Sequence, residues 1–243
     1  MVHFFSALPT PARGRSQSVI VARHLVPKTA GPLGFLAATT LGLIAALAMS
    51  VSPVLGQSDD FTVEQHFSVE RPADLSAADA MVIYDKVRDR MVAGYRLSHD
   101  AAAETFIDWR KFNSAPYRSA THGQRYVNNY GNTLAKAYGA YEEVPPLPVG
   151  AILAKDSFAV TQRGDVFTGP LFLMEKMPAG FRPDAHDWRY TMIMPDGSLF
   201  GTTNGEGSER VEFCITCHEA AGDEQQQLFF IPQEYRVEFL TLD

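Results

Sequence analysis

The pattern of apolar and polar residues predicts helices in the first part of the folded chain. After Ser76, a typical helix N-cap, apolar side chains recur three or four positions apart with charged residues between them. These apolar positions are Ala80, Tyr84, Val87, Met91 and Tyr95. A second helix is expected over 101–112, ending at the turn formers Asn113-Ser114-Ala115-Pro116, and a small helix over 132–141.

Short strand-like stretches dominate the rest of the chain. An extended segment is expected over 125–130 (RYVNNY), and further strands over 150–160, 171–177, 188–194, 198–202 and 210–213, separated by the turn signals RGD, PDG and NG. Consecutive strands joined by short turns pair in antiparallel fashion. We therefore expect an α+β domain in which N-terminal helices are followed by an antiparallel β-sheet.

An uncharged segment precedes this domain. No residue from Thr29 to Ser58 is charged, and the apolar run 33–49 follows four basic residues, Arg13, Arg15, Arg23 and Lys28. This order is typical of an export signal, although the run is also close to the roughly 20 residues that an uncleaved membrane anchor needs. We predict an export signal or membrane anchor over 1–56, a flexible leader over 57–74, a folded domain over 75–243 and a periplasmic location.

The charge of the exported part excludes one class of partner. Residues 1–56 contribute four of the 21 Lys and Arg and none of the 28 Asp and Glu, so their removal changes the formal net charge from −7 to −11. Such a surface repels nucleic acid and favours a basic protein partner.

The chain contains two cysteines, and both lie in the motif Cys214-Ile215-Thr216-Cys217-His218. A c-type haem site needs two thiols at this spacing for the haem vinyl groups and an imidazole directly after the second thiol for the iron. Zinc would need a fourth ligand, such as His122, His186 or a carboxylate. A redox disulfide is expected after an early strand of a βαβ unit, whereas this motif is near the C-terminus. We predict one covalently attached haem c, with His218 as the proximal ligand.

The position of the motif restricts the kind of cytochrome. Only 25 residues follow His218 and none is methionine, which disfavours the usual small electron carrier with a later methionine ligand. Such a carrier would need an internal ligand such as Met174, Met192 or Met194. The strand pattern over 150–213 also disfavours a four-helix cytochrome. A β-rich haem protein with a late attachment motif remains.

From about residue 117 to its end, the chain resembles the cytochrome P-460 family and the β-form of cytochrome c′ that shares its fold. The matching segments are RYVNNY (125–130), PVGAILAKDSF (148–158), GPLFLMEKM (169–177), DWRYTMIMPDG (187–197), FCITCH (213–218) and LFFIPQEYRV (228–237). This resemblance implies an antiparallel sheet with helices, usually in a homodimer. It also implies one five-coordinate haem with a vacant distal side.

The resemblance assigns a role to Lys155. In the P-460 branch a lysine is bonded to the haem macrocycle, and these proteins oxidise hydroxylamine to nitrous oxide or related nitrogen oxides. Lys155 matches that lysine, and the strand period places it on the same face as Ala151 and Leu153. The alternative is an exposed lysine at a strand edge, paired with Asp156 or Glu175.

Hydroxylamine oxidation also needs a base and an electron acceptor. The resemblance favours Glu209 as the base over Glu212, and Asp187 and Arg189 are expected to pair or to line the haem edge. We expect core positions for Phe158, Phe172 and Phe213. The sequence thus predicts an exported enzyme that oxidises hydroxylamine, or handles nitric oxide, and passes electrons to another cytochrome. The alternatives are a non-catalytic gas binder and an electron carrier.

Overall fold

The computed structural model describes residues 69–238, and its first long element is helix α2 (Ala77–Arg96). The Ser76 hydroxyl accepts a hydrogen bond from the backbone N–H of Asp79 at 3.1 Å, which satisfies one of the free N–H groups at the helix start. The predicted apolar face is confirmed, because its five positions are buried. The predicted signal or anchor over 1–56 lies outside the described residues. Within 69–238, the structure contains no helix of the length and apolar character needed to cross a membrane.

The predicted helix over 101–112 is wrong in its second half. Helix α3 (Ala101–Thr105), capped by Asp100, is followed by a 3₁₀ turn (Phe106–Asp108) and the short strand β1 (Arg110–Lys111). Strand β1 pairs with β3, and Phe106 and Phe112 are buried in two different hydrophobic clusters. Phe106 lies in the 3₁₀ turn and Phe112 directly follows β1, so the change from helix to strand occurs between these two buried rings.

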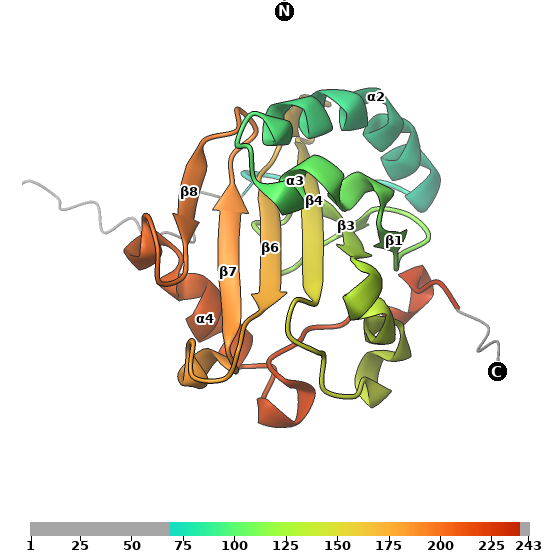
Figure 1. Cartoon of the computed structure of the whole chain (residues 1–243). Helices are drawn as coiled ribbons and strands as arrows, with labels where there is room; N and C mark the ends of the chain where they lie inside the picture. The colour runs from blue at the N-terminus through green and yellow to red at the C-terminus, as the bar shows by residue number, and fades with distance from the viewer. Residues whose placement is uncertain (1–68, 239–243) are drawn as a thin grey trace, which may run out of the picture. The chain divides into compact units, whose positions relative to one another are not determined.

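One antiparallel sheet organises the described chain, with strand order β1-β3-β4-β6-β7-β8 (Figure 1). Strand β2 (Tyr117–Arg118) also pairs with β3 (Tyr126–Gly131), and β5 (Val166–Thr168) with β4 (Ile152–Val160). The other strands are β6 (Leu171–Lys176), β7 (Trp188–Ile193) and β8 (Leu199–Thr202). The α+β prediction is therefore confirmed for this part of the chain. The small helix near 132–141 is 3₁₀ helix η2 (Thr133–Glu143).

The predicted strand over 210–213 is wrong. After β8 the chain forms the short 3₁₀ helix η4 (Ser208–Arg210) and then helix α4 (Glu212–Glu219). Further 3₁₀ turns are η3 (Pro183–Ala185), η5 (Asp223–Gln225) and η6 (Gln233–Tyr235). The chain therefore turns away from the sheet before the cysteine motif, which lies on a helix.

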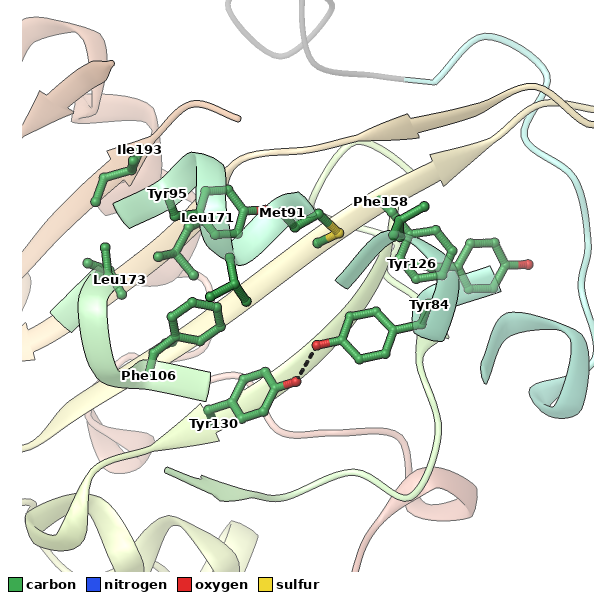
Figure 2. Close-up of a cluster of buried hydrophobic side chains, with 14 of the residues drawn as sticks. Tyr84, Met91, Tyr95, Phe106, Tyr126, Tyr130, Phe158, Leu171, Leu173 and Ile193 are labelled. Carbon is green, nitrogen blue, oxygen red and sulfur yellow. Dashed lines mark hydrogen bonds between the residues drawn. The ribbon is translucent and has the colours of Figure 1, made fainter. Parts of the chain in front are cut away.

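The sheet separates two buried layers. On one face, α2 and α3 cover side chains such as Tyr130, Phe158 and Leu171, as Figures 1 and 2 show. The second cluster contains Trp188, Ile215 from α4 and Leu228 from the C-terminal segment. Since side chains alternate along a strand, successive residues of β4 contribute to opposite layers.

A buried carboxylate lies in the helix-covered layer. Asp156 of β4 accepts hydrogen bonds from the Tyr84 hydroxyl at 2.5 Å and from the Asn128 amide at 3.0 Å. Tyr84 also pairs with the Tyr130 hydroxyl at 2.7 Å, the bond drawn in Figure 2. Burial raises the pKa of Asp156 to about 6, and its hydrogen bonds oppose this shift.

This carboxylate predicts a pH dependence of stability. Between the unfolded pKa near 4 and the folded pKa of about 6, the folded state binds more protons, so stability falls as pH rises through this window. The free energy of unfolding of the wild type should fall by about 3 kcal/mol as pH rises across this window. In Asp156→Asn this decrease should be absent. Urea unfolding of both proteins at several pH values measures the difference. Parallel curves for wild type and variant would contradict the prediction.

Candidate haem-binding site

The two thiols and the imidazole of the motif share one face of α4. Cys214, Cys217 and His218 are spaced i, i+3 and i+4, positions that are neighbours on a helix. All three residues line one cavity, and the two cysteines form no disulfide. The motif therefore presents its chemical groups together, in the order that covalent haem attachment requires.

Two contacts hold helix α4 in place. Ile215 is 2% exposed and packs in the second hydrophobic cluster. At the helix start, Arg182 donates two parallel hydrogen bonds to Glu212, at 3.1 and 2.9 Å. Glu212, the less favoured candidate for a distal base, thus anchors the first turn of α4.

His218 is prepared to bind a metal through Nε2. Its ring is 7% exposed and lies against Tyr190 and Phe229, with ring centroids 5.1 and 5.3 Å away. Its Nδ1 lies 2.8 Å from the backbone oxygen of Gln227, so Nδ1–H can donate there and leave the Nε2 lone pair for iron. Burial, reinforced by Lys155, lowers the pKa of His218 to about 4, which keeps the imidazole in its neutral, metal-binding form.

A strained turn holds the carbonyl that orients His218. Gln226 and Gln227 both have left-handed backbone angles, with φ of 53° and 59°. The indole N–H of Trp188 donates to the Gln226 oxygen at 2.9 Å, and the Gln227 side chain donates to the Asp184 oxygen at 2.9 Å. Left-handed residues other than glycine persist where surrounding contacts fix them, as these bonds do.

The cavity lies against the face of the sheet opposite to α2 and α3. It has a volume of about 360 Å³, within the range of small-molecule sites. Leu153, Phe172, Met174 and Phe213 contribute apolar wall. The core prediction is right for Phe158, which is fully buried, but Phe172 and Phe213 are partly buried and line the cavity.

Lys155 projects into the same cavity, on the face that the strand period predicts. It lies in β4, opposite Asn129 of β3 and Phe172 of β6, so it is not at a sheet edge. Asp156 points to the other layer and Glu175 pairs with Arg189, so the alternative of an exposed ion pair is wrong. Among the described residues the amine has no hydrogen-bond or ion-pair partner, and burial lowers the pKa of Lys155 to about 8. An unpaired amine therefore faces the cavity.

Several other candidate residues lie elsewhere. Glu209 does not line the cavity; its side chain is 75% exposed and pairs with Arg210. Asp187 accepts hydrogen bonds from the backbone N–H groups of Gly180 and Arg182. Among the candidate methionine ligands Met174, Met192 and Met194, the cavity lining includes Met174 alone.

Two cavity residues were not assigned to a haem site from the sequence. The Tyr190 hydroxyl is buried without a hydrogen-bond partner. His122, considered above as a zinc ligand, lies in the loop between β2 and β3 and lines the cavity with Lys155 and His218. Burial, followed by the charges of Lys155 and His218, lowers the pKa of His122 well below its usual value. Neither residue has a periodic pattern or motif that could have revealed it.

The donor set fits a haem better than the two alternatives. Within residues 69–238, no group of three or more His, Cys, Asp or Glu side chains is arranged to hold a metal ion. Burial and the neighbouring Cys217 raise the pKa of the Cys214 thiol to about 12, opposite to the shift of a redox-active thiol. Haem needs two thiols, one imidazole and an apolar cavity, and all are present on one side of α4. The orphaned Tyr190 hydroxyl also provides a donor for a bound group.

Comparison with known proteins does not place the chain in a family. No protein-family model matches it, and no curated protein matches its sequence.

Proposed function

We propose that this protein is an exported mono-haem c-type cytochrome of the P-460 type, which oxidises hydroxylamine or handles nitric oxide and passes electrons to another cytochrome. The observation that carries the proposal is the unpaired amine of Lys155 in the cavity that Cys214, Cys217 and His218 line. The cysteine motif alone is common to many cytochromes, whereas the resemblance to the P-460 family includes a lysine at this strand position.

Each residue has a distinct part in this proposal. Cys214 and Cys217 hold the haem covalently, and His218, oriented by the Gln227 carbonyl, is its proximal ligand. Lys155 would bond to a carbon of the macrocycle through its amine, with an N–H and a C–H bond replaced by one N–C bond and the two electrons taken by an external oxidant such as a peroxide. The neutral amine product would remove the cost of a buried ammonium group. The bound haem supplies an open iron position for the substrate nitrogen and accepts its electrons. Phe172 and Phe213 exclude bulk water from the cavity.

Turnover by the complete haem-loaded protein tests the proposal. The full chain is expressed in a host that attaches c-type haem, and purified protein is mixed with hydroxylamine and an oxidised electron acceptor. We expect acceptor reduction that depends on hydroxylamine, with nitrous oxide or a related nitrogen oxide as the product. Haem-loaded protein that does not consume hydroxylamine would contradict the enzymatic function.

The apolar cavity walls favour a second candidate function, reversible binding of nitric oxide or a similar gas without catalysis. In this case Lys155 would stay unbonded, and added nitric oxide would bind without net oxidation of a substrate. Binding of nitric oxide by protein that fails to oxidise hydroxylamine would support this candidate. A third candidate, an electron carrier with Met174 as its sixth ligand, predicts that nitric oxide and cyanide are blocked.

The structure gives a definite expectation for Glu209. Because this side chain is largely exposed and outside the cavity, Glu209→Ala should leave hydroxylamine turnover unchanged. Steady-state kinetics of the haem-loaded variant measure the effect. A strong decrease in kcat with normal haem content would restore Glu209 as the base that the family resemblance implies.

The partners follow from the sequence and remain proposals. The predicted signal would bring residues 57–243 to the periplasm, where their formal net charge of −11 favours a basic redox partner. A homodimer is implied by the resemblance. An uncleaved segment 33–49 would anchor the domain at a membrane.

A further inference from the structure

The imidazole of His122 lines the cavity and is oriented by hydrogen bonds at Nδ1, so its Nε2 is suited to contact a ligand of the iron. His122 belongs to the loop between β2 and β3 and lines the same cavity as Lys155 and His218. The inference developed from it rests on the proposed function, because it requires a haem on His218. It assigns a residue to the side of the haem for which the sequence provides Glu209 and, less favoured, Glu212 as candidates.

The ring of His122 is fixed by its own loop. Its Nδ1 lies 3.0 Å from the Ser119 hydroxyl and 3.1 Å from the Thr121 hydroxyl. The backbone N–H of His122 also donates to the Ser119 oxygen at 3.3 Å. The ring also packs against Phe172 in a T-shaped arrangement, with the centroids 4.8 Å apart. Three contacts therefore hold the imidazole before any ligand enters.

These contacts leave Nε2 available. Within residues 69–238, no protein group forms a hydrogen bond or ion pair with this atom. A hydroxyl can donate or accept, so Ser119 and Thr121 can support either tautomer of the neutral ring. Nε2 can thus donate to a bound anion or accept a proton from the N–H or O–H of a bound substrate.

His122 and His218 belong to different walls of the cavity. The His218 ring lies between Tyr190 and Phe229, whereas the His122 ring contacts Phe172. Phe172 is the cross-strand neighbour of Lys155 on the sheet. A haem held by Cys214, Cys217 and His218 would leave the wall formed by His122 and Phe172 available to a ligand of the iron.

Apart from Lys155 and Gln124, the other polar groups around the cavity are already engaged or lie beside His218. Asn129 bonds Tyr117 and Tyr138, and the hydroxyls of Thr191 and Thr202 pair at 2.7 Å. Tyr190 lies against His218 itself. Gln124 has no partner among the described residues, so its side chain is not held in one position, unlike the ring of His122.

We propose that His122 is the distal hydrogen-bonding residue of this site, and that its Nε2 contacts small nitrogenous or anionic ligands bound to the haem iron opposite His218. Ser119 and Thr121 act as positioning residues for its ring.

Cyanide binding to the ferric holoprotein tests this role without relying on turnover. A hydrogen bond to a charged group contributes about 1.5–3 kcal/mol, so His122→Leu should raise the Kd for cyanide about tenfold or more. His122→Gln retains an N–H donor and should raise the Kd less. The control is Thr191→Val, which removes a hydroxyl that pairs with Thr202, from the strand position next to Tyr190 and on the opposite face of the sheet, and should leave the Kd unchanged.

The possible outcomes separate the alternatives. An unchanged Kd in haem-loaded His122→Leu overturns the proposal. Tighter cyanide binding, with a change from a six-coordinate to a five-coordinate spectrum before cyanide is added, also overturns it, because His122 would then be an iron ligand. If His122→Leu does not load haem, the double variant Ser119→Ala, Thr121→Ala decides. A severalfold rise in Kd supports the proposal, and no rise overturns it.

Failure of the proposed function is distinguishable from failure of this inference. Wild-type protein without covalent haem would contradict the haem site and the role of His122 together. Haem-loaded protein that binds cyanide but does not oxidise hydroxylamine would contradict only the enzymatic function. In that case the comparison of His122→Leu with wild type still tests the hydrogen bond.

Discussion

Replacing Cys214 and Cys217 together with serine is expected to abolish covalent haem attachment. Both sulfurs lie on the cavity face of α4, and serine oxygens do not form the thioether bonds that keep haem c on the polypeptide after denaturation. Each single serine variant retains one thiol and should keep a reduced amount of bound haem. Haem fluorescence or peroxidase staining of a denaturing gel measures the attached fraction.

The control for this prediction lies on the same helix. Thr216 is exposed on the opposite side of α4 from the cavity, so Thr216→Ala should attach haem as the wild type does. Normal covalent haem in the double serine variant would contradict the site. Equal losses in the double serine variant and in Thr216→Ala would show a folding effect instead.

Replacing Lys155 with methionine is expected to change the haem without releasing it. Methionine is of similar length and apolar, so it fills the cavity wall but has no amine to bond to the macrocycle. A red-shifted absorption of the reduced protein should return to that of an ordinary c-type haem. Hydroxylamine turnover should fall about tenfold or more, which corresponds to at least about 1.4 kcal/mol in the barrier.

A second partly buried lysine provides the control. Lys111 lies 5.6 Å from the ring centroid of Tyr84, in the helix-covered layer, and does not line the cavity. Lys111→Met should leave the spectrum and the turnover unchanged. A red-shifted spectrum that persists in Lys155→Met would remove Lys155 from the site. Loss of the red shift in both variants would indicate an indirect effect.

The periodic spacing of apolar residues predicted helix α2 and strand β4, each of which buries one continuous face. The spacing of Tyr84, Met91 and Tyr95 specifies the stripe of α2, and two-residue alternation in 150–160 specifies which face of β4 carries Lys155. The cysteine motif predicts a haem from local spacing alone, and the haem stays a prediction, although the two thiols and the imidazole do line one cavity. These signals are local, so sequence was sufficient for them.

Other parts depended on tertiary contacts that the sequence does not encode locally. Residues 210–213 contain the end of η4 and the start of α4, where Glu212 pairs with Arg182, 30 positions away in sequence. His122 reaches the cavity from a loop in which Gly123 and Gln124 have positive φ angles. Glu209 is three residues before the helix start, yet its side chain is exposed.

Mass analysis of the haem peptide tests the haem site most directly. Wild-type holoprotein is digested with a protease, and the haem-containing fraction is isolated and sequenced. We expect one haem joined to the peptide with Cys214 and Cys217 and, through Lys155, to a second peptide from β4. A haem peptide without the β4 segment would contradict the lysine bond and favour the gas binder. An unmodified peptide across 214–218, with no haem bound, would contradict the haem site itself.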